Sequence, residues 1–408
     1  MKIALVNTLY PPASVGGAER VVRTLARTLV RRGDQVTVLC LSDQAAAAQE
    51  VDEGVRVVRI PLQNIYWPFG PQASAPARLL WHAIDSYNLA AERTLRRLLR
   101  EESPDIVHTH NLAGFSTRAW SAAKALGLPL VHTLHDYYLL CPRATMCRPQ
   151  GNCATLCGSC SAFSRPRRAN AALVDSVVGV SEYVLRRHAM EGTFASPTTQ
   201  HVVHNGLTHV DIPPEARTPA PRSSPDVLRL GFLGRVEANK GIELLLEATA
   251  RLKPGSWQLV VAGKGDADYV AHLRARFPSP AVIFLGVSGL ESFFRQIDLL
   301  VVPSLWNEPL GMVAFESYFF GVPVAASRRG GLTEIVTAET GVLFDPDSPG
   351  SLAAVLSALQ EEPARLAALA LGASRAAARF EPAAMCDAYQ AIYRGAVSAR
   401  LETGASVV

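Results

Sequence analysis

Residues 299–320 read LLVVPSLWNEPLGMVAFESYFF: an apolar run, a turn and a second apolar segment. Leu299–Pro303 has the apolar, β-branched composition of a short buried strand. Leu310–Phe320 can form a helix, and Pro309 suits the first helical position, where its missing N–H costs nothing. The pattern therefore predicts strand, loop and helix in succession, which is the repeating unit of an α/β fold with a parallel sheet.

Two carboxylates, Glu308 and Glu316, stand eight positions apart in this stretch. A helix start offers unpaired N–H groups that attract an anion. Glu308 would lie just ahead of that start and Glu316 about two turns inside the helix. Carboxylates beside and below an anion site can bind the hydroxyls of a sugar and a ribose, which suits a nucleotide-sugar. A helix with one capping acid and one exposed acid would show the same pattern.

The alternation of strands and helices extends over the whole chain. Strands are predicted in the first half at Lys2–Asn7, Gln35–Leu41, Val55–Ile60, Asp105–His108, Leu130–Leu134, Val177–Val180 and Val202–His204. Those of the second half are Val227–Gly234, Trp257–Ala262, Val282–Leu285, Leu299–Pro303, Val322–Ala326 and Val342–Phe344. The main predicted helices are Gly17–Arg32, Leu79–Arg100, Gly241–Leu252, Asp268–Arg276, Leu290–Gln296 and Leu310–Phe320, followed by two alanine-rich helices at about 349–379 and 383–396.

Residues 208–226 separate the two series, because five prolines fall there with little to bury. A chain of 408 residues should also split into about two domains. We therefore expect a Rossmann-like domain over 1–207, a linker over 208–226 and a second such domain over 227–379. Ligands of these folds bind at the carboxyl ends of the strands, so two facing domains would form a central cleft.

Composition narrows the class of protein. No run of eighteen apolar residues and no signal-peptide pattern occur, so a cytoplasmic protein is expected. Residues 1–205 hold 22 Lys and Arg against 15 Asp and Glu. This excess indicates either solvated helix faces or a peripheral contact with an anionic acceptor or the inner face of the membrane. Nucleic acid is disfavoured as a partner, because the arginines lack interleaved aromatic residues.

Two motifs that follow predicted strands could bind phosphate. Gly16 and Gly17 permit close approach of a backbone to a ligand, although plain turn chemistry is the alternative. They do not form the three-glycine fingerprint of a dehydrogenase. Arg235 and Lys240, one at a strand end and one at a helix start, could clamp a pyrophosphate.

Other polar residues allow more than one interpretation. Asp266 and Asp268 form the Asp-x-Asp pattern that carries a divalent metal in some nucleotide-sugar enzymes, but we interpret one of them as a helix cap. His135 ends a strand, where it is well placed for proton or hydroxyl chemistry. A structural role is the alternative for His135 and for the neighbouring His108, His110 and His132.

The cysteines are clustered, with five of seven between Cys141 and Cys160. Disulfides are disfavoured in a cytoplasmic chain, so such thiols point to a metal. Cys141, Cys153, Cys157 and Cys160 could form a closed, structural zinc site, with Cys147 as a spare or substitute ligand. Free or redox-active thiols and an iron–sulfur cluster are the alternatives.

Taken together, the motifs resemble those of the retaining nucleotide-sugar glycosyltransferases of family 4, which have the GT-B fold of two doubly wound parallel-sheet domains facing a cleft. The similarity runs from Lys2 to about Arg394, and its most specific part is the pair Glu308 and Glu316. Other family motifs are matched by Gly16-Gly17 with Glu19, His135, Asn205-Gly206, Arg235 with Lys240-Gly241, and Gly330-Gly331 with Glu334.

The resemblance implies a donor site in the second domain. Arg235 and Lys240 would bind the donor diphosphate and neutralise the leaving nucleotide, with no cofactor or metal ion needed for catalysis. Glu308 would bind donor-sugar hydroxyls and Glu316 the ribose. Backbone amides would assist from Leu310, Gly311, Met312 and Val313.

In the first domain, the resemblance implies that Gly16 and Gly17 face the reacting diphosphate and that His135 lies beside the donor sugar. The family uses a front-face reaction, in which the leaving phosphate oxygen helps take the acceptor proton and the anomeric configuration is kept. A C-terminal helix, 380–398, would pack back on the N-terminal domain. The cysteine loop departs from the commonest family pattern and could shape the acceptor site.

We therefore expect a hexosyltransferase that moves a sugar from a nucleoside-diphosphate sugar to an acceptor hydroxyl, with a lipid-linked sugar or glycan as acceptor, in cell-surface polysaccharide or glycolipid synthesis. Two alternatives remain. A nucleotide-sugar epimerase or hydrolase would share the architecture but need an acid or base pair at the sugar ring. A zinc-stabilised, arginine-rich binding module would account for residues 141–168 but not for the second half.

Overall fold

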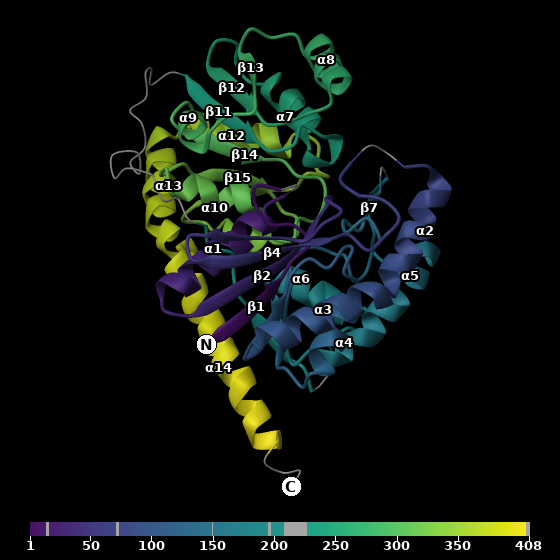
Figure 1. The fold of residues 1–408 in the computed structure, drawn as a ribbon. Coiled ribbons are helices and arrows are strands. Elements are labelled where there is room, and N and C mark those ends of the chain that lie inside the picture. Colours follow the sequence, from purple (N-terminus) through teal and green to yellow (C-terminus); the bar gives the residue numbers. More distant parts are fainter. Residues whose placement is uncertain (14–15, 71–72, 149, 195–196, 208–226, 405–408) are drawn as a thin grey trace. The chain divides into compact units, whose positions relative to one another are not determined.

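The computed structural model describes residues 1–408 except 14–15, 71–72, 149, 195–196, 208–226 and 405–408 (Figure 1). The chain forms two compact units. The first comprises Met1–Met146, Cys153–Thr208 and Glu381–Val408, and the second comprises Cys147–Asn152 and His209–Phe380. The linker expected over 208–226 lies outside the described residues.

The first unit is built on an eight-stranded sheet in the order β10-β9-β6-β5-β1-β2-β4-β3. Neighbouring strands are parallel except for β3 and β4, which are antiparallel. Strands β5, β6 and β9 are buried along their whole length, as parallel strands covered by helices on both faces must be. The strands are β1 (Lys2–Val6), β2 (Gln35–Ser42), β3 (Ala48–Asp52), β4 (Val55–Pro61), β5 (Ile106–Thr109), β6 (Leu130–Leu134), β9 (Ser176–Gly179) and β10 (Thr199–Val202).

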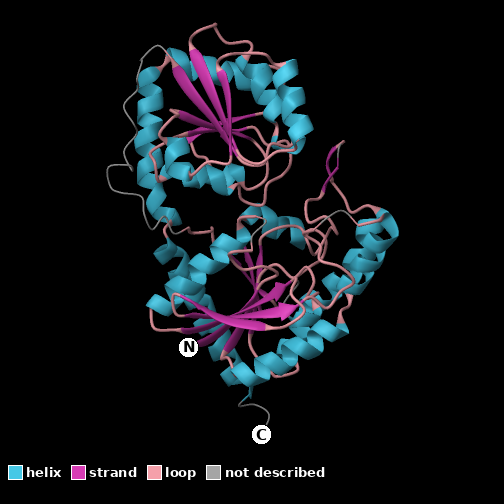
Figure 2. Ribbon diagram, turned by 45° about the horizontal axis from the view of Figure 1, so that its top comes forward, coloured by secondary structure: helices cyan, strands magenta, loops and turns pink. Residues whose placement is uncertain are grey.

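Helices flank this sheet (Figure 2). They are α1 (Ala18–Arg31), α2 (Ala75–Ser86), α3 (Leu89–Glu102), α4 (Arg118–Lys124), α5 (Gly158–Asn170), α6 (Glu182–Ala189) and α14 (Pro382–Gly404). The single helix predicted over Leu79–Arg100 is wrong, because Asn88 divides it. The Asn88 Oδ1 accepts a hydrogen bond from the Ala91 N–H at 3.0 Å and so caps α3.

The C-terminal helix α14 belongs to the first unit and packs beside α1 (Figure 1). Arg32 donates to the Ala383 carbonyl at 3.1 Å, and the Gln390 side chain donates to Asp34 at 2.8 Å. Tyr393 of α14 is fully buried against the sheet. The last helix of the chain is therefore part of the core of the first unit.

The second unit has a six-stranded, fully parallel sheet in the order β13-β12-β11-β14-β15-β16. Its strands are β11 (Leu228–Leu233), β12 (Trp257–Ala262), β13 (Val282–Gly286), β14 (Leu299–Val302), β15 (Val324–Ser327) and β16 (Gly341–Phe344), and β7 (Cys147–Arg148) pairs with β8 (Gly151–Asn152) in a separate hairpin. Its helices are α7 (Ile242–Thr249), α8 (Ala267–Arg276), α9 (Leu290–Phe294), α10 (Met312–Tyr318), α11 (Leu332–Ile335), α12 (Ser351–Glu361) and α13 (Pro363–Ala376).

Two helix predictions in the second unit need correction. Helix α10 starts at Met312 rather than at Pro309, because Gly311 adopts a left-handed conformation with φ of 86° and ends the loop. Glu316 is consequently little more than one turn inside the helix. The helix predicted over 349–379 is two helices, since Pro363 opens α13 and cannot continue α12.

Candidate active site

A largely buried ion pair lies at the carboxyl end of the second sheet. Lys240 ends a short 3₁₀ turn, η3 (Ala238–Lys240), after β11, and Glu308 lies in the loop after β14. The Lys240 Nζ donates to Glu308 Oε1 at 2.8 Å, and the Ser304 hydroxyl donates to the same oxygen at 2.9 Å. The Lys240 ammonium also lies 5.0 Å from the centroid of the Trp306 ring. The structure thus brings together two predicted donor-site residues that are 68 positions apart in the sequence.

The Glu308 carboxyl is ionised at neutral pH. Burial alone would raise its pKa, but the Lys240 charge and hydrogen bonds from Lys240, Ser304 and Trp306 outweigh burial and hold the pKa below its ordinary value. An ionised carboxylate only accepts hydrogen bonds, and hydroxyl groups can donate them. Glu308 therefore has the chemistry needed to bind a sugar.

Two consecutive glycines support the backbone of Glu308. The Gly331 N–H donates to the Glu308 carbonyl at 2.8 Å. A Cβ atom added at Gly330, which has φ of 52°, would lie 2.1 Å from the same carbonyl oxygen. Only glycine fits so close an approach in that conformation. The Gly330-Gly331 pair thus fixes the loop that presents Glu308.

The other predicted donor-site residues occupy the same unit. The Arg235 side chain, 55% exposed, follows β11 and donates to Glu237 at 2.8 Å. Glu316 is buried within α10. At the start of α10, the chain is buried at Leu310 and Gly311 and half-buried at Met312 and Val313.

Asp266 caps helix α8, as the sequence predicted for one of the two aspartates. Its side chain accepts a hydrogen bond from the Tyr269 N–H at 3.0 Å. Asp268 lies exposed in the first turn of the helix. Asp266 therefore has a structural role that requires no metal.

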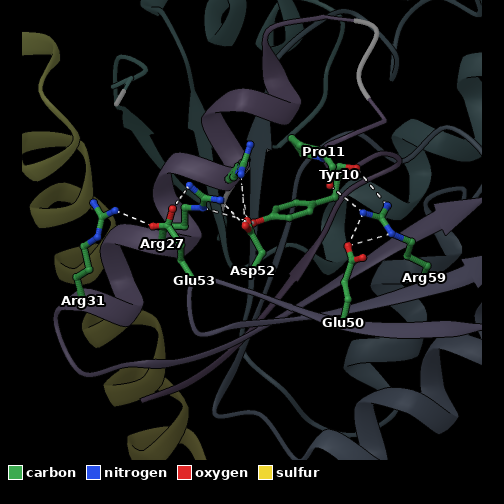
Figure 3. A network of polar contacts seen from close by, with 9 residues as sticks. Tyr10, Pro11, Arg27, Arg31, Glu50, Asp52, Glu53 and Arg59 are labelled. Atoms are coloured by element: carbon green, nitrogen blue, oxygen red, sulfur yellow. Dashed lines mark hydrogen bonds and ion pairs between the residues drawn. The ribbon is translucent and has the colours of Figure 1, made fainter. Parts of the chain in front are cut away.

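In the first unit, Gly16 and Gly17 directly precede α1, and the Gly16 N–H donates to Glu19 at 3.1 Å. The segment is anchored on both sides by the β3–β4 hairpin (Figure 3). Upstream, the Tyr10 hydroxyl donates to Asp52 at 2.8 Å; downstream, Arg23 of α1 donates to the same carboxylate at 3.1 Å.

Further hydrogen bonds reinforce this anchor. Arg27 of α1 also donates to Asp52, at 3.0 Å through Nε. Arg59 of β4 donates to the carbonyls of Tyr10 and Pro11 at 3.2 and 2.8 Å (Figure 3). Asp52 was not among the predicted site residues, because β3 is a short polar strand without an apolar pattern.

Four histidines gather at the carboxyl ends of β5 and β6. The His110 Nδ1 lies 2.9 Å from the His135 Nε2, and the His108 and His110 rings have centroids 4.0 Å apart. His108 is held by the Tyr393 hydroxyl at 2.6 Å and by Thr133 at 2.8 Å. The His132 Nδ1 lies 2.9 Å from the Thr109 hydroxyl.

Asp136, next to His135, is a second group that the sequence did not single out. Burial, followed by the negative charge of Glu19, raises its pKa to about 6 despite a hydrogen bond from the Tyr138 N–H. A half-buried carboxyl whose pKa is raised by desolvation and by a like charge is typical of functional sites.

Comparisons with known proteins decide the family. A family model described as Glycosyltransferase Family 4 matches residues 15–209, and one described as Glycosyl transferases group 1 matches residues 228–362. A D-inositol 3-phosphate glycosyltransferase of Xylanimonas cellulosilytica is 31% identical over 408 aligned residues, which cover 92% of this chain and 91% of the relative. The chain belongs to the family 4 glycosyltransferases. The transferase predicted from the sequence is thereby confirmed.

A second relative of this family 4 glycosyltransferase is an uncharacterized 42.6 kDa protein in the cps region of Klebsiella pneumoniae. It is 31% identical over 348 residues, which cover 85% of this chain and 90% of the relative. Among solved structures, Anabaena HepE in complex with UDP has a TM-score of 0.72 at 20% identity, covering 97% of this chain and 100% of that one. Sucrose-phosphate synthase from Thermosynechococcus elongatus has a TM-score of 0.74 at 21% identity, covering 98% and 99%. These likenesses confirm the GT-B fold.

The four predicted zinc ligands of the glycosyltransferase are not joined in disulfide bonds. Burial raises the pKa of the Cys160 thiol to about 12, and neighbouring thiols of Cys157 and Cys141 contribute. Three of the four predicted ligands therefore lie near one another. Within the described residues, no group of three or more His, Cys, Asp or Glu side chains is arranged to hold a metal ion. Zinc binding stays a prediction.

Many arginines of the first unit are engaged within it. Arg167 and Asp85 form a completely buried ion pair at 2.9 Å. On the surface, Arg97 pairs with Glu101 at 2.9 Å. No described helix is long and apolar enough to cross a bilayer. Each of these two ion pairs joins one arginine to one carboxylate, so the net positive excess of this half is unchanged.

Proposed function

We propose that this glycosyltransferase is a retaining hexosyltransferase that needs no metal ion for transfer. It moves a hexose from a nucleoside-diphosphate sugar to a hydroxyl of a lipid-linked sugar or glycan, in cell-surface polysaccharide or glycolipid synthesis. The observation that carries the proposal is the Lys240–Glu308 pair, which joins a fixed cation to an ionised acceptor of hydroxyl hydrogen bonds. The relative in the Klebsiella cps region supports the biosynthetic role.

The cations would do the work of a metal. When the nucleoside diphosphate leaves, negative charge grows on its phosphate oxygens, and groups already in position stabilise that charge most effectively. Lys240 is held in place by Glu308. Arg235 is exposed, and Glu237, with which it forms an ion pair, is exposed as well. The capping role of Asp266 argues in the same direction, because its carboxylate is engaged by α8.

The remaining donor-site residues follow from the family resemblance. Glu316 binds the ribose, and the amides at Leu310–Val313 assist with the diphosphate. In the first unit, Gly16 and Gly17 approach the reacting phosphates and His135 acts beside the donor sugar. The acceptor proton passes to the leaving phosphate oxygen on the front face, so the anomeric configuration is kept.

A donor screen tests this proposal. UDP-, GDP-, ADP- and dTDP-sugars are added to the wild-type chain, and the donor raises the melting temperature by mass action. The donor found is then given to the enzyme with and without EDTA, and the linkage of the product is assigned by NMR. We expect an unchanged initial rate in EDTA and retained configuration. Inverted product, or immediate loss of transfer that Mg²⁺ restores, would contradict the proposal.

The same donor, radiolabelled and incubated alone, separates transfer from the alternatives. An epimerase or hydrolase converts it without an acceptor, whereas a transferase leaves it largely intact until an acceptor hydroxyl is supplied. Rapid, acceptor-independent conversion would favour the epimerase or hydrolase.

We further propose that the enzyme contacts an anionic membrane surface through α2 and the loop before it. Leu79 and Leu80 of α2 are 60% and 53% exposed, and Ile65 and Phe69 are 47% and 40% exposed. Arg78, also exposed, adds a positive charge next to Leu79 and Leu80 in the sequence. Apolar side chains beside a cation suit a surface of anionic lipid headgroups.

Vesicle sedimentation tests the membrane contact. The wild-type enzyme should bind vesicles containing phosphatidylglycerol more strongly than pure phosphatidylcholine, and Leu79→Gln with Leu80→Gln should abolish the difference. Leu371→Gln, at a leucine that is 62% exposed on α13, is the matched control. Equal binding by the double variant would overturn this part of the proposal.

A further inference from the structure

His110 and His135 form a pair in which only His135 reaches the surface. His108, His110 and His132 are 0%, 1% and 4% exposed, whereas His135 is half-buried. Burial lowers the pKa of His135 to about 4 and that of His110 well below its ordinary value. Both rings are therefore neutral at pH 7, and each has one N–H and one lone pair.

The contact between the rings uses one proton. At 2.9 Å, His110 Nδ1 and His135 Nε2 are within hydrogen-bond distance, so one nitrogen donates and the other accepts. Two arrangements satisfy this condition. Either His135 donates from Nε2, or His110 donates from Nδ1 and His135 has its own proton on Nδ1.

The second ring nitrogen of His110, Nε2, distinguishes these two proton arrangements. His110 Nε2 is buried and has no hydrogen-bond partner among the described residues. If His110 accepted at Nδ1, its proton would sit on Nε2 as a buried N–H without an acceptor, and such orphan donors are rare in folded proteins. In the other arrangement the proton of His110 is used in the contact with His135, and Nε2 keeps only a lone pair in its buried position.

The His110 ring is itself held in place. Its backbone N–H donates to the Val6 carbonyl at 2.8 Å. Its ring packs on His108, which Tyr393 and Thr133 fix by hydrogen bonds. His110 therefore has a fixed orientation from which to set that of His135.

We propose that His110 is a positioning residue that holds His135 in the tautomer protonated on Nδ1. The single lone pair of His135 is then engaged by His110, so His135 cannot take the proton of the acceptor hydroxyl. His135 instead presents an N–H donor to an oxygen of the bound substrates. The inference rests on the proposed function for the role of His135 in transfer, but the tautomer itself does not depend on activity.

NMR of the ¹⁵N-histidine-labelled chain tests the tautomer directly. Long-range ¹H–¹⁵N correlations at pH 7 should show the His135 ring protonated on Nδ1, with the signals assigned by their loss in His135→Gln. Protonation on Nε2, or a doubly protonated ring, would overturn the inference. Because this experiment needs no donor or acceptor, its outcome is separate from any failure to find transfer activity.

Variants of His110 test positioning. Asparagine can place an amide N–H near the position of Nδ1, whereas leucine cannot donate. His110→Leu should release the His135 tautomer and lower kcat by about tenfold, as loss of a group that orients an active residue does, with little change in the KM of the donor. His110→Asn should keep most of the His135 tautomer protonated on Nδ1 and most of the wild-type kcat.

The control is His272→Leu, at an exposed histidine of α8. Melting curves establish that each variant is folded. A folded His110→Leu variant that keeps the wild-type tautomer and kcat would refute the positioning role, as would equal losses in the Leu and Asn variants.

Discussion

The Lys240 ammonium lies 2.8 Å from the Glu308 carboxylate, in surroundings that leave only 18% and 12% of the two side chains exposed. Each charge offsets the desolvation cost of burying the other. The pair lies at the carboxyl ends of the parallel strands, where folds of this type bind their ligands. One contact thus links the stability of the second unit to its chemistry, and the two consequences can be measured separately.

The first prediction concerns activity. Lys240→Met removes the cation proposed to stabilise the leaving diphosphate, so kcat/KM should fall by about 10²- to 10³-fold. Lys253→Met, at an exposed lysine in the same unit, should leave it unchanged. Steady-state rates with the donor from the screen provide the measurement. A folded Lys240→Met enzyme with near wild-type rates would remove the diphosphate role from Lys240.

The second prediction concerns stability and pH. In the wild-type chain the pKa of Glu308 is lowered, so its contribution is complete above the ordinary carboxyl pKa and is lost as pH falls through the folded value. In Lys240→Met, burial acts on the carboxyl without the opposing cation, and the pKa should rise above the ordinary value. The unfolding free energy of Lys240→Met should then fall, relative to wild type, as pH rises above the ordinary carboxyl pKa.

Urea unfolding at pH 4 and pH 7 measures this effect. The difference in unfolding free energy between wild type and Lys240→Met should grow toward pH 7, where an unpaired buried charge costs about 3–5 kcal/mol. A gap that stays constant or narrows with rising pH would mean that Glu308 is not buried as an ion.

Elements defined by neighbouring residues could be predicted from the sequence, whereas features that depend on residues far apart in the chain could not. Strands β6 and β12 were predicted with their exact bounds because apolar or β-branched residues make up most of each strand. The polar edge strand β3 has no such signal, since most of its residues face solvent. Asn88 shows the same limit for helices, because a cap inside an apolar pattern looks like an ordinary surface residue.

The candidate site shows the same contrast between residues that motifs indicate and residues that only the tertiary structure brings to them. Glu308, Lys240 and His135 could be chosen from motifs, because a family keeps its chemistry at fixed places along the chain. The contacts that hold such residues are set by tertiary structure. His110 contacts His135 from 25 residues away, and in the anchor before α1 Asp52 contacts Tyr10 from 42 residues away. No local pattern encodes such pairings.

The third prediction tests the anchor in Figure 3. Burial would raise the pKa of Asp52, but hydrogen bonds from Arg27, Tyr10 and Arg23 outweigh it and lower the pKa to about 2. The carboxylate should therefore contribute roughly 2 kcal/mol at pH 7, a contribution lost as pH falls from about 4 toward 2. Asp52→Asn should lose that stability, and Asp43→Asn, at an exposed aspartate, should not. Identical urea midpoints for Asp52→Asn and wild type would show that the network adds nothing.

The fourth prediction concerns the buried pair of Arg167 and Asp85. Asp85 also accepts from the Tyr138 hydroxyl at 2.7 Å and the Gly114 N–H at 2.6 Å, so the pair ties α2 and α5 to the chain just after His135. Arg167→Met leaves a buried carboxylate without its counter-ion and should cost about 3–5 kcal/mol. Arg165→Met, at an exposed arginine of the same helix, is the control. Equal unfolding free energies for the two variants would refute the prediction.

The last prediction concerns the cysteine loop. If Cys141, Cys153, Cys157 and Cys160 bind zinc, freshly reduced protein contains about one zinc per chain by elemental analysis. Because metal binding to such a loop is coupled to its folding, Cys160→Ser should lose both the zinc and part of the thermal stability. Cys40→Ser, at a buried cysteine of β2 whose thiol contacts the Val58 carbonyl, should keep the zinc.

The transfer rate should be unchanged after brief EDTA treatment, even while EDTA slowly removes the zinc, because a closed four-thiolate site has no open position for chemistry. Absence of zinc from wild-type protein purified under reducing conditions would contradict the prediction. Cys141, Cys157 and Cys160 would then be neighbouring thiols without a metal.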